Sequence, residues 1–433
     1  MRLIIATGIY PPDIGGPATY SKGIAGELGR RGWYVKIITY ADKIHPLTRG
    51  EVIRISRKRN VVMRYFLYTR ELTKLAKKAD LIYAQGPVSE GLPAYLASKI
   101  TGKKYVLKVV GDPAWERFLS RKQENKKTKK QEKAENINSE DGKFVDLEKF
   151  QGMRGLPLKI KILRWIERLV SKNAEKIITP SEYLKKIVMM WGADFEKIQV
   201  IYNSIDDTKD EISVNKEEIR NLGGDIILSA GRLAPWKGFG VLIDIMPKLL
   251  AVNPNFKLVI VGDGPEYGNL VSSIKYQVSS KREETTNKEI KKLEISLPAQ
   301  AGNWKLYNDV SIEKKIILVG KLEHEKLLDL MRKSKIFVLN SGYEGLSHVI
   351  IEAMQAGLPC AVSNKGGNPE LVEDGKTGLL FEYNNKEQIF NAIKRLWQDK
   401  ELRSRVVNGG REKIKEFGFE RMVEETMRIV SNI

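Results

Sequence analysis

The sequence predicts an α/β protein built from two doubly wound domains with parallel sheets. Short apolar runs recur along the chain with helical-period segments between them, and this alternation is typical of parallel sheets covered by helices. Each run ends in a glycine or polar loop, and the 433 residues are enough for two domains that each bury a core. We expect these domains to be residues 1–205 and 206–416.

The composition limits the classes of function. The formal net charge of +20 suits a nucleic acid, an anionic membrane surface or a phosphorylated substrate as partner. No nucleic-acid-binding motif accompanies the charge, so anionic lipid or a phosphate-bearing substrate is the simpler interpretation, and we expect no nucleic-acid partner. One cysteine and three scattered histidines exclude an internal disulfide and a zinc cluster. No secretory leader and no apolar run long enough to span a bilayer occur, which predicts a cytoplasmic protein.

Strands of the first predicted domain alternate with helices. We expect strands at residues 3–6, 35–39, 81–83, 105–110, 176–179 and 199–202, and a helix from Thr19 to Arg31. The loops after the strands carry polar residues such as Gln85, Asp112 and Ser181. In a parallel sheet these loops lie at one edge, and that edge is where such sheets bind ligands.

Gly15 and Gly16 precede the first predicted helix. Glycines at this position let a phosphate approach the backbone N–H groups of a helix N-terminus. A plain strand-to-helix turn explains the two glycines equally well from the residues alone.

Two polar segments of this domain interrupt the alternation. Residues 121–149 are rich in Lys, Glu, Asn and Gln with almost no aromatic residue, and we expect a mobile excursion there. Residues 158–173 form a basic amphipathic pattern around Trp165, which would suit contact with an anionic bilayer. An ordinary domain helix with a solvated basic face is the better-supported alternative.

The second predicted domain begins after a polar link near residues 206–221, with a strand at 226–230. The next loop places Arg232 and Lys237 five residues apart between glycines, where they can hold two phosphates from one side. Charge-assisted hydrogen bonds of this kind contribute about 1.5–3 kcal/mol each. Strands at 257–261 and 316–319 follow, with Gly262 and Leu322 in the loops after them and a second polar insertion at 275–312 between them.

A strand at residues 336–339 leads through a loop into a helix that starts near Ser347. Glu344 and Glu352 are eight residues apart, which is about 12 Å in a helix, so they are too distant to act as a close acid/base pair. They are better suited to holding different parts of one elongated ligand. Gly345, Leu346 and Ser347 lie between them and offer backbone N–H groups to an anionic or hydroxyl-rich ligand.

At these residues the sequence resembles the retaining glycosyltransferases of family 4, the glycosyl transferases group 1. The E-x7-E pattern is accompanied by A-M-x-x-G-x-P and G-G-x-P-E segments after it and by G-R-L…K-G and V-G-x-G-P segments before it. The resemblance covers most of the chain apart from the two insertions. It implies the GT-B architecture, in which two Rossmann-like domains face a central cleft and the last helix, residues 417–433, packs back on the N-terminal domain.

The resemblance also implies roles for single residues. Glu344 would contact the donor sugar and Glu352 the ribose, and the helix-start residues between them would bind the donor as well. The remaining donor-binding candidates are Arg232 and Lys237 at the diphosphate, Gly15 and Gly16 facing the cleft, Gly262 in the V-G-x-G-P turn and Leu322 near the base. Candidate acceptor-side residues are Tyr20, Gln85 and Ser181.

One position departs from the family pattern. Many members place a histidine after the strand that here ends at Val110, whereas this chain has Gly111 and Asp112. Asp112 either takes over the contact with the sugar, as a catalytic residue alongside Glu344, or caps the helix that begins before Trp115.

The prediction is therefore a retaining hexosyltransferase that needs no metal or other cofactor. It would move a mannose-, glucose- or N-acetylhexosamine-type sugar from a nucleoside-diphosphate sugar to a glycan or lipid-linked hydroxyl, in polysaccharide or glycolipid biosynthesis. We expect it in the cytoplasm, peripherally on the cytoplasmic face of an anionic membrane. A front-face displacement needs no protein nucleophile, which suits the lack of a close carboxylate pair. A donor-binding protein without transfer activity and a sugar-nucleotide epimerase of the same architecture are the alternatives.

Overall fold

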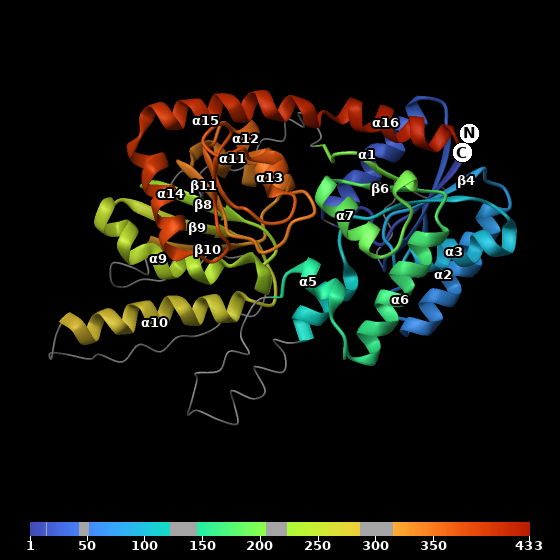
Figure 1. The fold of residues 1–433 in the computed structure, drawn as a ribbon, viewed down its shortest axis with the longest axis horizontal. Coiled ribbons are helices and arrows are strands. Elements are labelled where there is room, and N and C mark those ends of the chain that lie inside the picture. Colours follow the sequence, from blue (N-terminus) through green and yellow to red (C-terminus); the bar gives the residue numbers. More distant parts are fainter. Residues whose placement is uncertain (14, 43–51, 122–144, 205–222, 286–314) are drawn as a thin grey trace. The chain divides into compact units, whose positions relative to one another are not determined.

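The computed structural model describes residues 1–13, 15–42, 52–121, 145–204, 223–285 and 315–433 (Figure 1). The chain divides into two compact units. The N-terminal unit comprises Met1–Lys209, Tyr343–His348 and Glu416–Ile433, and the C-terminal unit comprises Asp210–Gly342 and Val349–Lys415. Tyr343–His348, in the middle of the E-x7-E motif, therefore makes its contacts in the N-terminal unit.

The N-terminal unit is built on a seven-stranded parallel sheet in the order β3-β2-β1-β4-β5-β6-β7. Its strands are β1 (Arg2–Ala6), β2 (Tyr34–Tyr40), β3 (Val52–Ile55), β4 (Leu81–Ala84), β5 (Tyr105–Lys108), β6 (Lys176–Thr179) and β7 (Ile198–Val200). β1 pairs with β2 on one side and with β4 on the other, so the strand order reverses there. Ligands of doubly wound sheets bind at the carboxyl end of such a reversal.

Besides the helical residues 113–121, this unit contains the α-helices α1 (Gly16–Arg30), α2 (Val61–Ala76), α3 (Gly91–Thr101), α5 (Leu147–Gly152), α6 (Leu158–Asn173), α7 (Glu182–Met190) and α16 (Phe419–Ser431). Local chemistry sets several of their ends. The side chain of Asn60 accepts the Met63 N–H at the start of α2, and Gly102 ends α3 with a φ of 70° that a side chain would strain.

The helix α16 attaches the end of the chain to the N-terminal unit. Its apolar residues recur at helical spacing, and Met422, Val423, Ile429 and Val430 are buried in the same core as Ile24 of α1. Burial of one such side chain stabilises the fold by about 1.5–3 kcal/mol, so packing rather than helix propensity holds this helix.

The C-terminal unit has a six-stranded parallel sheet in the order β10-β9-β8-β11-β12-β13. Its strands are β8 (Asp225–Ala230), β9 (Phe256–Val261), β10 (Ile316–Gly320), β11 (Ile336–Leu339), β12 (Cys360–Ser363) and β13 (Leu379–Phe381). The order reverses between β8 and β11, which places the candidate ligand edge there.

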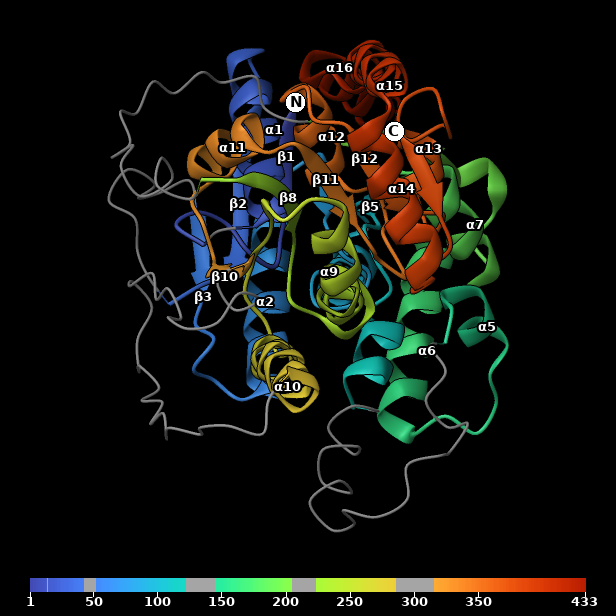
Figure 2. The ribbon, with the colours of Figure 1, turned by 90° about the vertical axis from the view of Figure 1, so that its left-hand side faces the viewer.

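The helices assigned to this unit are α9 (Phe239–Val252), α10 (Tyr267–Thr285), α11 (His324–Lys333), α12 (His348–Gln355), α13 (Asn368–Leu371), α14 (Lys386–Gln398) and α15 (Lys400–Lys413), of which α12 starts in the Tyr343–His348 segment. Figure 2 shows α9 between α10 and α14, both of which contact it. Ile243 and Met246 of α9 pack with Ile393 of α14 in one apolar core.

The two predicted parallel sheets are confirmed, with differences at the element ends. The first helix begins at Gly16 rather than Thr19, because Pro17 fits the first turn of a helix. β5 ends at Lys108 rather than Val110, and the short strands β3 and β13 were not predicted.

The predicted polar segments fall mainly outside the described residues. This holds for residues 122–144, for 205–222, which contain the link, and for 286–314 of the second insertion. The end of the first insertion was predicted wrongly, because α5 starts at Leu147, whose side chain is buried. In the described part of the chain, no helix is long and apolar enough to cross a bilayer.

Candidate active site

The N-terminus of α1 is open towards the ligand edge of the N-terminal unit. Gly15 precedes the helix, Gly16 is its first residue, and no described side chain caps it. A Cβ added at Gly16 would meet no protein atom within 4 Å, so protein packing does not require glycine there. The first-turn N–H groups and the space beside Gly16 therefore suit the approach of a phosphate.

Tyr20 and Gln85, two predicted acceptor-side residues, take part in hydrogen bonds between α1 and the carboxyl end of β4. The Tyr20 and Tyr83 hydroxyl oxygens are 2.7 Å apart, and Ser21 Oγ donates to Gln85 Oε1. Gln85 Nε2 is buried and has no hydrogen-bond partner among the described residues. The amide thus keeps one donor for a ligand or a water molecule.

Lys108 is a functional candidate that the sequence reasoning missed. Its side chain is buried at the end of β5, with Nζ 3.7 Å from the centroid of the Tyr20 ring and no hydrogen-bond partner in the described part of the chain. Burial lowers the pKa of Lys108 to about 7. A lysine inside the otherwise apolar run YVLKVV was the signal that could have found it.

Ser181, the third acceptor-side candidate, is the N-cap of α7. Its Oγ accepts the Leu184 N–H at 3.1 Å, and the residue is buried at the carboxyl end of β6. The hydroxyl therefore has a structural role already, and its contact with an acceptor stays a prediction.

Asp112 is fully buried, and its carboxylate makes contacts within the N-terminal unit. Its oxygens accept the Trp115 N–H and the Gln151 side-chain N–H, each at 2.7 Å. Burial raises its pKa, and the nearby buried Glu167, which accepts the Ala114 N–H at 2.9 Å, has a raised pKa because of burial and the charge of Asp112. These are the contacts of a helix cap; a contact between Asp112 and a sugar stays a prediction.

The segment Tyr343–His348 packs against the loop after β5. The Tyr343 ring lies 4.9 Å from the Trp115 ring, and a Cβ at Gly345 would come within 2.8 Å of Val110 O. Glycine is therefore required at 345 by close approach of two backbones. This contact places Glu344 beside the Gly111–Asp112 loop.

His348, the last residue of this segment, is close enough to Lys108 to sense its charge. Its pKa falls to about 4 because of burial and the positive charge of Lys108. The imidazole is therefore neutral at physiological pH and is not poised as a general acid.

The C-terminal unit builds its loop after β8 from closely packed backbone. Gly231 has a φ of 153° and Gly262 a φ of 148°, and a Cβ at Gly262 would overlap Gly231 O. Leu233 N donates to Asp263 O at 2.9 Å and Gly262 N donates to Gly320 O at 2.8 Å. These two backbone hydrogen bonds link the carboxyl ends of β8, β9 and β10.

Arg232 and Lys237 are carried by this loop. Arg232 is exposed, Lys237 is half-buried, and a Cβ at Gly231 would lie 3.8 Å from Lys237 Nζ. Gly342 N donates to Trp236 O at 2.6 Å, which fixes the same loop to the end of β11. Two cations are thus held over a fixed glycine-rich backbone, a geometry that suits a diphosphate.

Glu352 lies in α12 with a side chain only 13% exposed. Burial raises its pKa to about 7. His324 Nδ1 is 3.6 Å from Glu352 Oε1, and Leu322 stands two residues earlier, just after β10. His324 was not predicted as a site residue, although its place at a helix start after a strand was visible in the sequence.

The predicted site residues thus form two groups. Gly15, Gly16, Tyr20, Gln85, Asp112, Ser181 and Glu344–Ser347 belong to the N-terminal unit, and Arg232, Lys237, Gly262, Leu322 and Glu352 belong to the C-terminal unit. The glutamates of the E-x7-E pattern are divided between the two. Among the described residues, no group of His, Cys, Asp and Glu side chains is arranged to hold a metal ion.

Two parallel α/β sheets with ligand loops at their carboxyl edges define the GT-B class of glycosyltransferase folds. The Anabaena protein HepE, solved in complex with UDP and glucose, matches with a TM-score of 0.70 at 17% identity, over 100% of both chains. Sucrose-phosphate synthase of Thermosynechococcus elongatus matches with a TM-score of 0.71 at 18% identity, over 100% of this chain and 98% of its own.

Sequence comparison identifies the family. Residues 15–204 match the glycosyl transferase 4-like domain and residues 224–399 match the glycosyl transferases group 1 domain, so the chain belongs to this family of retaining, metal-independent glycosyltransferases.

Two curated relatives extend this result. An uncharacterized glycosyltransferase of Methanocaldococcus jannaschii is 24% identical over 99% of this chain and 97% of its own length. The UDP-Gal:alpha-D-GlcNAc-diphosphoundecaprenol alpha-1,3-galactosyltransferase of Escherichia coli is 28% identical over 57% of this chain and 59% of that enzyme.

Proposed function

We propose that the protein transfers a hexose from a nucleoside-diphosphate sugar to a hydroxyl of a lipid-linked glycan, in cell-surface polysaccharide or glycolipid biosynthesis. The observation that carries this proposal is the loop of Arg232 and Lys237 over Gly231 and Gly262, in a chain that belongs to a glycosyltransferase family. The printed name of the Escherichia coli relative, a UDP-galactose enzyme acting on a diphosphoundecaprenol acceptor, supports a lipid-linked acceptor.

The donor residues act through positioning and charge in this proposal. Arg232 and Lys237 stabilise the negative charge that develops on the leaving nucleoside diphosphate, as preorganised donors do in other transferases. Glu344 binds the sugar and Glu352 the ribose. The first-turn N–H groups beside Gly16 approach the phosphates.

The proposed reaction is a front-face displacement with retention. The acceptor oxygen forms a bond to the anomeric carbon from the side on which the diphosphate leaves, and the bond between that carbon and the phosphate oxygen breaks. A diphosphate oxygen takes the hydroxyl proton, so neither a protein nucleophile nor a metal ion enters the scheme. We place the reaction at the cytoplasmic face of a membrane, where a lipid-linked acceptor is available.

Isothermal titration with UDP-, GDP-, ADP- and dTDP-sugars in the presence of EDTA tests the donor half. One donor should bind the wild-type protein, and Arg232→Ala should weaken that affinity at least tenfold. Lys248→Ala, which removes an exposed cation elsewhere in the C-terminal unit, is the matched control and should leave the affinity unchanged. Equal donor affinity in all three proteins would remove Arg232 from the site.

The two alternatives give different results in the same preparation. A donor-binding protein would bind the sugar nucleotide without releasing nucleoside diphosphate, whether or not an acceptor is present. An epimerase would convert the donor into its epimer with no acceptor. Acceptor-dependent release of nucleoside diphosphate with a retained anomeric configuration excludes both.

A further inference from the structure

A cavity of the N-terminal unit lies beside the strand-order reversal, at the carboxyl ends of β1, β2 and β3. Its volume is about 310 Å³, and its lining includes Gly8, Tyr40, Arg57, Val61, Arg64 and Tyr65. This volume falls within the range of about 300–1,000 Å³ that is typical of small-molecule sites. None of these six residues belongs to the candidate site described above.

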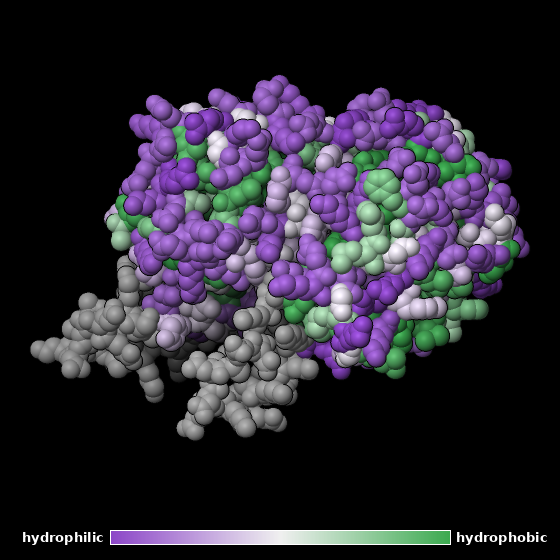
Figure 3. All heavy atoms as spheres, viewed as in Figure 1, coloured by the Kyte–Doolittle hydropathy of each residue, from purple (hydrophilic) through white to green (hydrophobic). Residues whose placement is uncertain are grey.

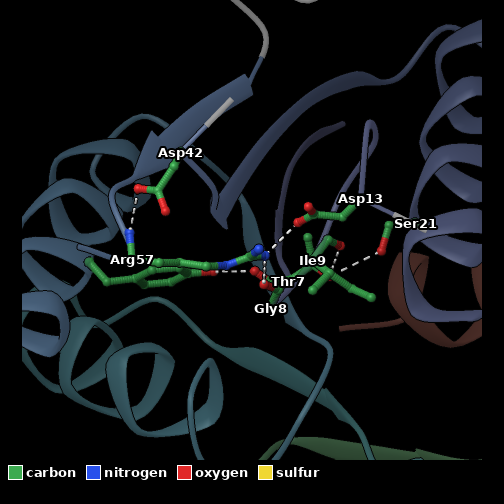
Figure 4. Close-up of polar contacts among 8 residues, drawn as sticks. Thr7, Gly8, Ile9, Asp13, Ser21, Asp42 and Arg57 are labelled. Carbon is green, nitrogen blue, oxygen red and sulfur yellow. Dashed lines mark hydrogen bonds and ion pairs between the residues drawn. The ribbon is translucent and has the colours of Figure 1, made fainter. Parts of the chain in front are cut away.

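Arg57 is held in place at this cavity by the backbone and by two aspartates. Its backbone N–H donates to Asp42 Oδ1 at 2.9 Å, and Nη2 donates to Gly8 O at 3.3 Å and pairs with the Asp13 carboxylate. Figure 4 shows the Arg57 side chain reaching from the Asp42 side towards Gly8 and Asp13. The Arg57 side chain is 35% exposed, so its guanidinium remains accessible to a ligand.

Arg64 provides a second guanidinium, one turn into α2. Its guanidinium makes no hydrogen bond or ion pair with any described residue, and the residue is half-buried at the cavity wall. Arginine is the side chain best suited to phosphate, because its planar fork can donate two parallel hydrogen bonds. A cavity with one restrained and one available guanidinium therefore favours an anion with several oxygens.

The acidic groups near the cavity contact Arg57 or are buried, and none of the described ones pairs with Arg64. Asp13 pairs with Arg57, and Glu90 lies behind Gly8, where a Cβ would overlap the Glu90 carboxyl. Burial raises the pKa of Glu90 to about 7, and its carboxyl accepts a hydrogen bond from Ser89 Oγ at 2.7 Å. Glu90 therefore carries less than a full negative charge near neutral pH. Asp42, like Asp13, lies at Arg57, which leaves the Arg64 guanidinium without a paired carboxylate among the described residues.

The rim of the cavity is apolar and exposed, which points to a lipid rather than to a free phosphate. In the first two turns of α2, Val61 is 56% exposed, Val62 80%, Met63 41% and Phe66 61%. Soluble surfaces rarely present such a group together, and side chains of this kind enter the interfacial layer of membranes.

The apolar rim continues over the neighbouring helices. α2 packs on α3 and α3 on α6, and these helices expose Leu96, Ile100, Leu158, Ile162 and Trp165. Figure 3 shows apolar residues among the hydrophilic ones over this part of the N-terminal unit. Lys58, Arg59 and Arg64 lie at the start of α2, Arg70 lies further along the helix, and the acidic residue of α2 is Glu71. The charge complements an anionic bilayer, at about 1 kcal/mol for each cation near the surface.

We propose that this cavity binds the phosphate group of a lipid-linked acceptor through Arg57 and Arg64, while Val62, Met63 and Phe66 enter the bilayer that carries the lipid. The inference rests on the proposed function, because it assigns the acceptor of that reaction a site. It also moves the expected membrane contact from α6 alone to a face centred on α2.

Vesicle flotation tests the site with three probes. These are phosphatidylcholine vesicles carrying geranylgeranyl diphosphate, phosphatidylcholine vesicles brought to the same surface charge with phosphatidylglycerol, and free inorganic diphosphate as competitor. The wild-type protein should bind the diphosphate vesicles at least tenfold more tightly than the matched anionic vesicles. Inorganic diphosphate should compete only at much higher concentration, because it lacks the lipid.

Variants assign the binding to residues. Arg64→Gln should reduce binding of the diphosphate vesicles about tenfold, to the level of the matched anionic vesicles. Arg64→Lys should give an intermediate affinity, because lysine keeps the positive charge but lacks the two parallel N–H donors of a guanidinium. Arg70→Gln, on the same helix, should change the preference less than twofold. Phe66→Ser should weaken binding to both kinds of vesicle equally. Unchanged thermal unfolding of each variant confirms that it is folded.

Two results would overturn the inference. Equal binding to the two vesicle types would show that surface charge alone attracts the protein. Equal affinity for free and lipid-linked diphosphate would make this a free-phosphate site. Donor titration of Arg64→Gln separates this inference from the proposed function. Normal donor binding together with a lost preference for diphosphate vesicles would support both. A wild-type protein that binds no donor would refute the proposed function and leave the vesicle result unaffected.

Discussion

The carboxyl edges of the two sheets differ in the groups that they present to a ligand. The edge of the C-terminal unit depends on backbone: Gly231 and Gly262 adopt positive φ and touch, and the same loop carries the exposed Arg232 and the half-buried Lys237. The edge of the N-terminal unit depends on buried side chains such as Glu90, Lys108 and Asp112. A ligand at the former replaces water around exposed charges, whereas a ligand at the latter meets groups whose protonation the fold has already shifted.

Replacement of Glu344 should have the largest effect, because this residue lies in the segment that packs on the N-terminal unit and is the proposed sugar contact. Glu344→Gln should lower kcat by about 10²–10³-fold, as expected for loss of one preorganised polar group at a reacting centre. Steady-state kinetics with the donor found by titration measures this loss, with unchanged circular dichroism as the control for folding. Wild-type kcat in this variant would contradict the assignment.

Glu90→Gln tests the buried chemistry of the N-terminal edge through stability. The pKa of Glu90 is raised from 4.5 to about 7 by burial, so between these values the folded chain holds a proton that the unfolded chain releases. The free energy of unfolding of the wild-type protein therefore falls as pH rises through this window, by about 3 kcal/mol in total.

In Glu90→Gln this part of the pH dependence should disappear, so the variant should be more stable than the wild type above pH 7. Urea unfolding at a series of pH values measures the difference. Parallel pH profiles for the two proteins would mean that Glu90 is ionised and solvated in the folded state.

Two glycine substitutions compare the edges directly. Gly262→Ala should destabilise the fold by about 1–2 kcal/mol and weaken donor binding, because the residue has positive φ and its Cβ would overlap Gly231 O. Gly16→Ala should leave the melting temperature unchanged, since its Cβ meets no protein atom, yet it should weaken donor binding if a phosphate approaches there.

Thermal unfolding and donor titration of both variants give the comparison. Loss of stability in Gly16→Ala would show that the glycine serves the turn and not a ligand.

Asp112→Asn should have the smallest effect. The asparagine keeps an oxygen for the Trp115 N–H, so we expect about 1 kcal/mol of lost stability and a kcat/KM within about threefold of the wild type. A loss of kcat/KM greater than tenfold at unchanged stability would instead assign Asp112 a contact with the sugar.

The difference between an edge formed by backbone and an edge formed by buried side chains explains which parts of the site the sequence could predict. The C-terminal edge was readable because the spacing of Gly231, Arg232, Lys237 and Gly262 encodes a backbone path, and sequence patterns report such paths well. The pairing of His324 with Glu352 and the surroundings of Lys108 were not readable. They depend on which strands become neighbours, which residue spacing does not encode.

Short elements were also beyond prediction. β3 is four residues long and contains Arg54, and β13 has three residues, so neither forms a pattern that exceeds the background of apolar residues. The cavity beside β3 consequently had no signal in the sequence.

Gly8 and Gly86 approach the Glu90 carboxyl from the ends of two strands, and this arrangement limits how the sequence can vary. A side chain at Gly8 becomes compatible with the fold once Glu90 is shortened, for example to serine, because the carboxyl is the atom group it would overlap. Gly86 gains no such freedom, because its φ of 152° excludes other residues whatever stands at 90. In a library of random substitutions, position 8 should therefore vary together with position 90, and position 86 should remain glycine in every folded member.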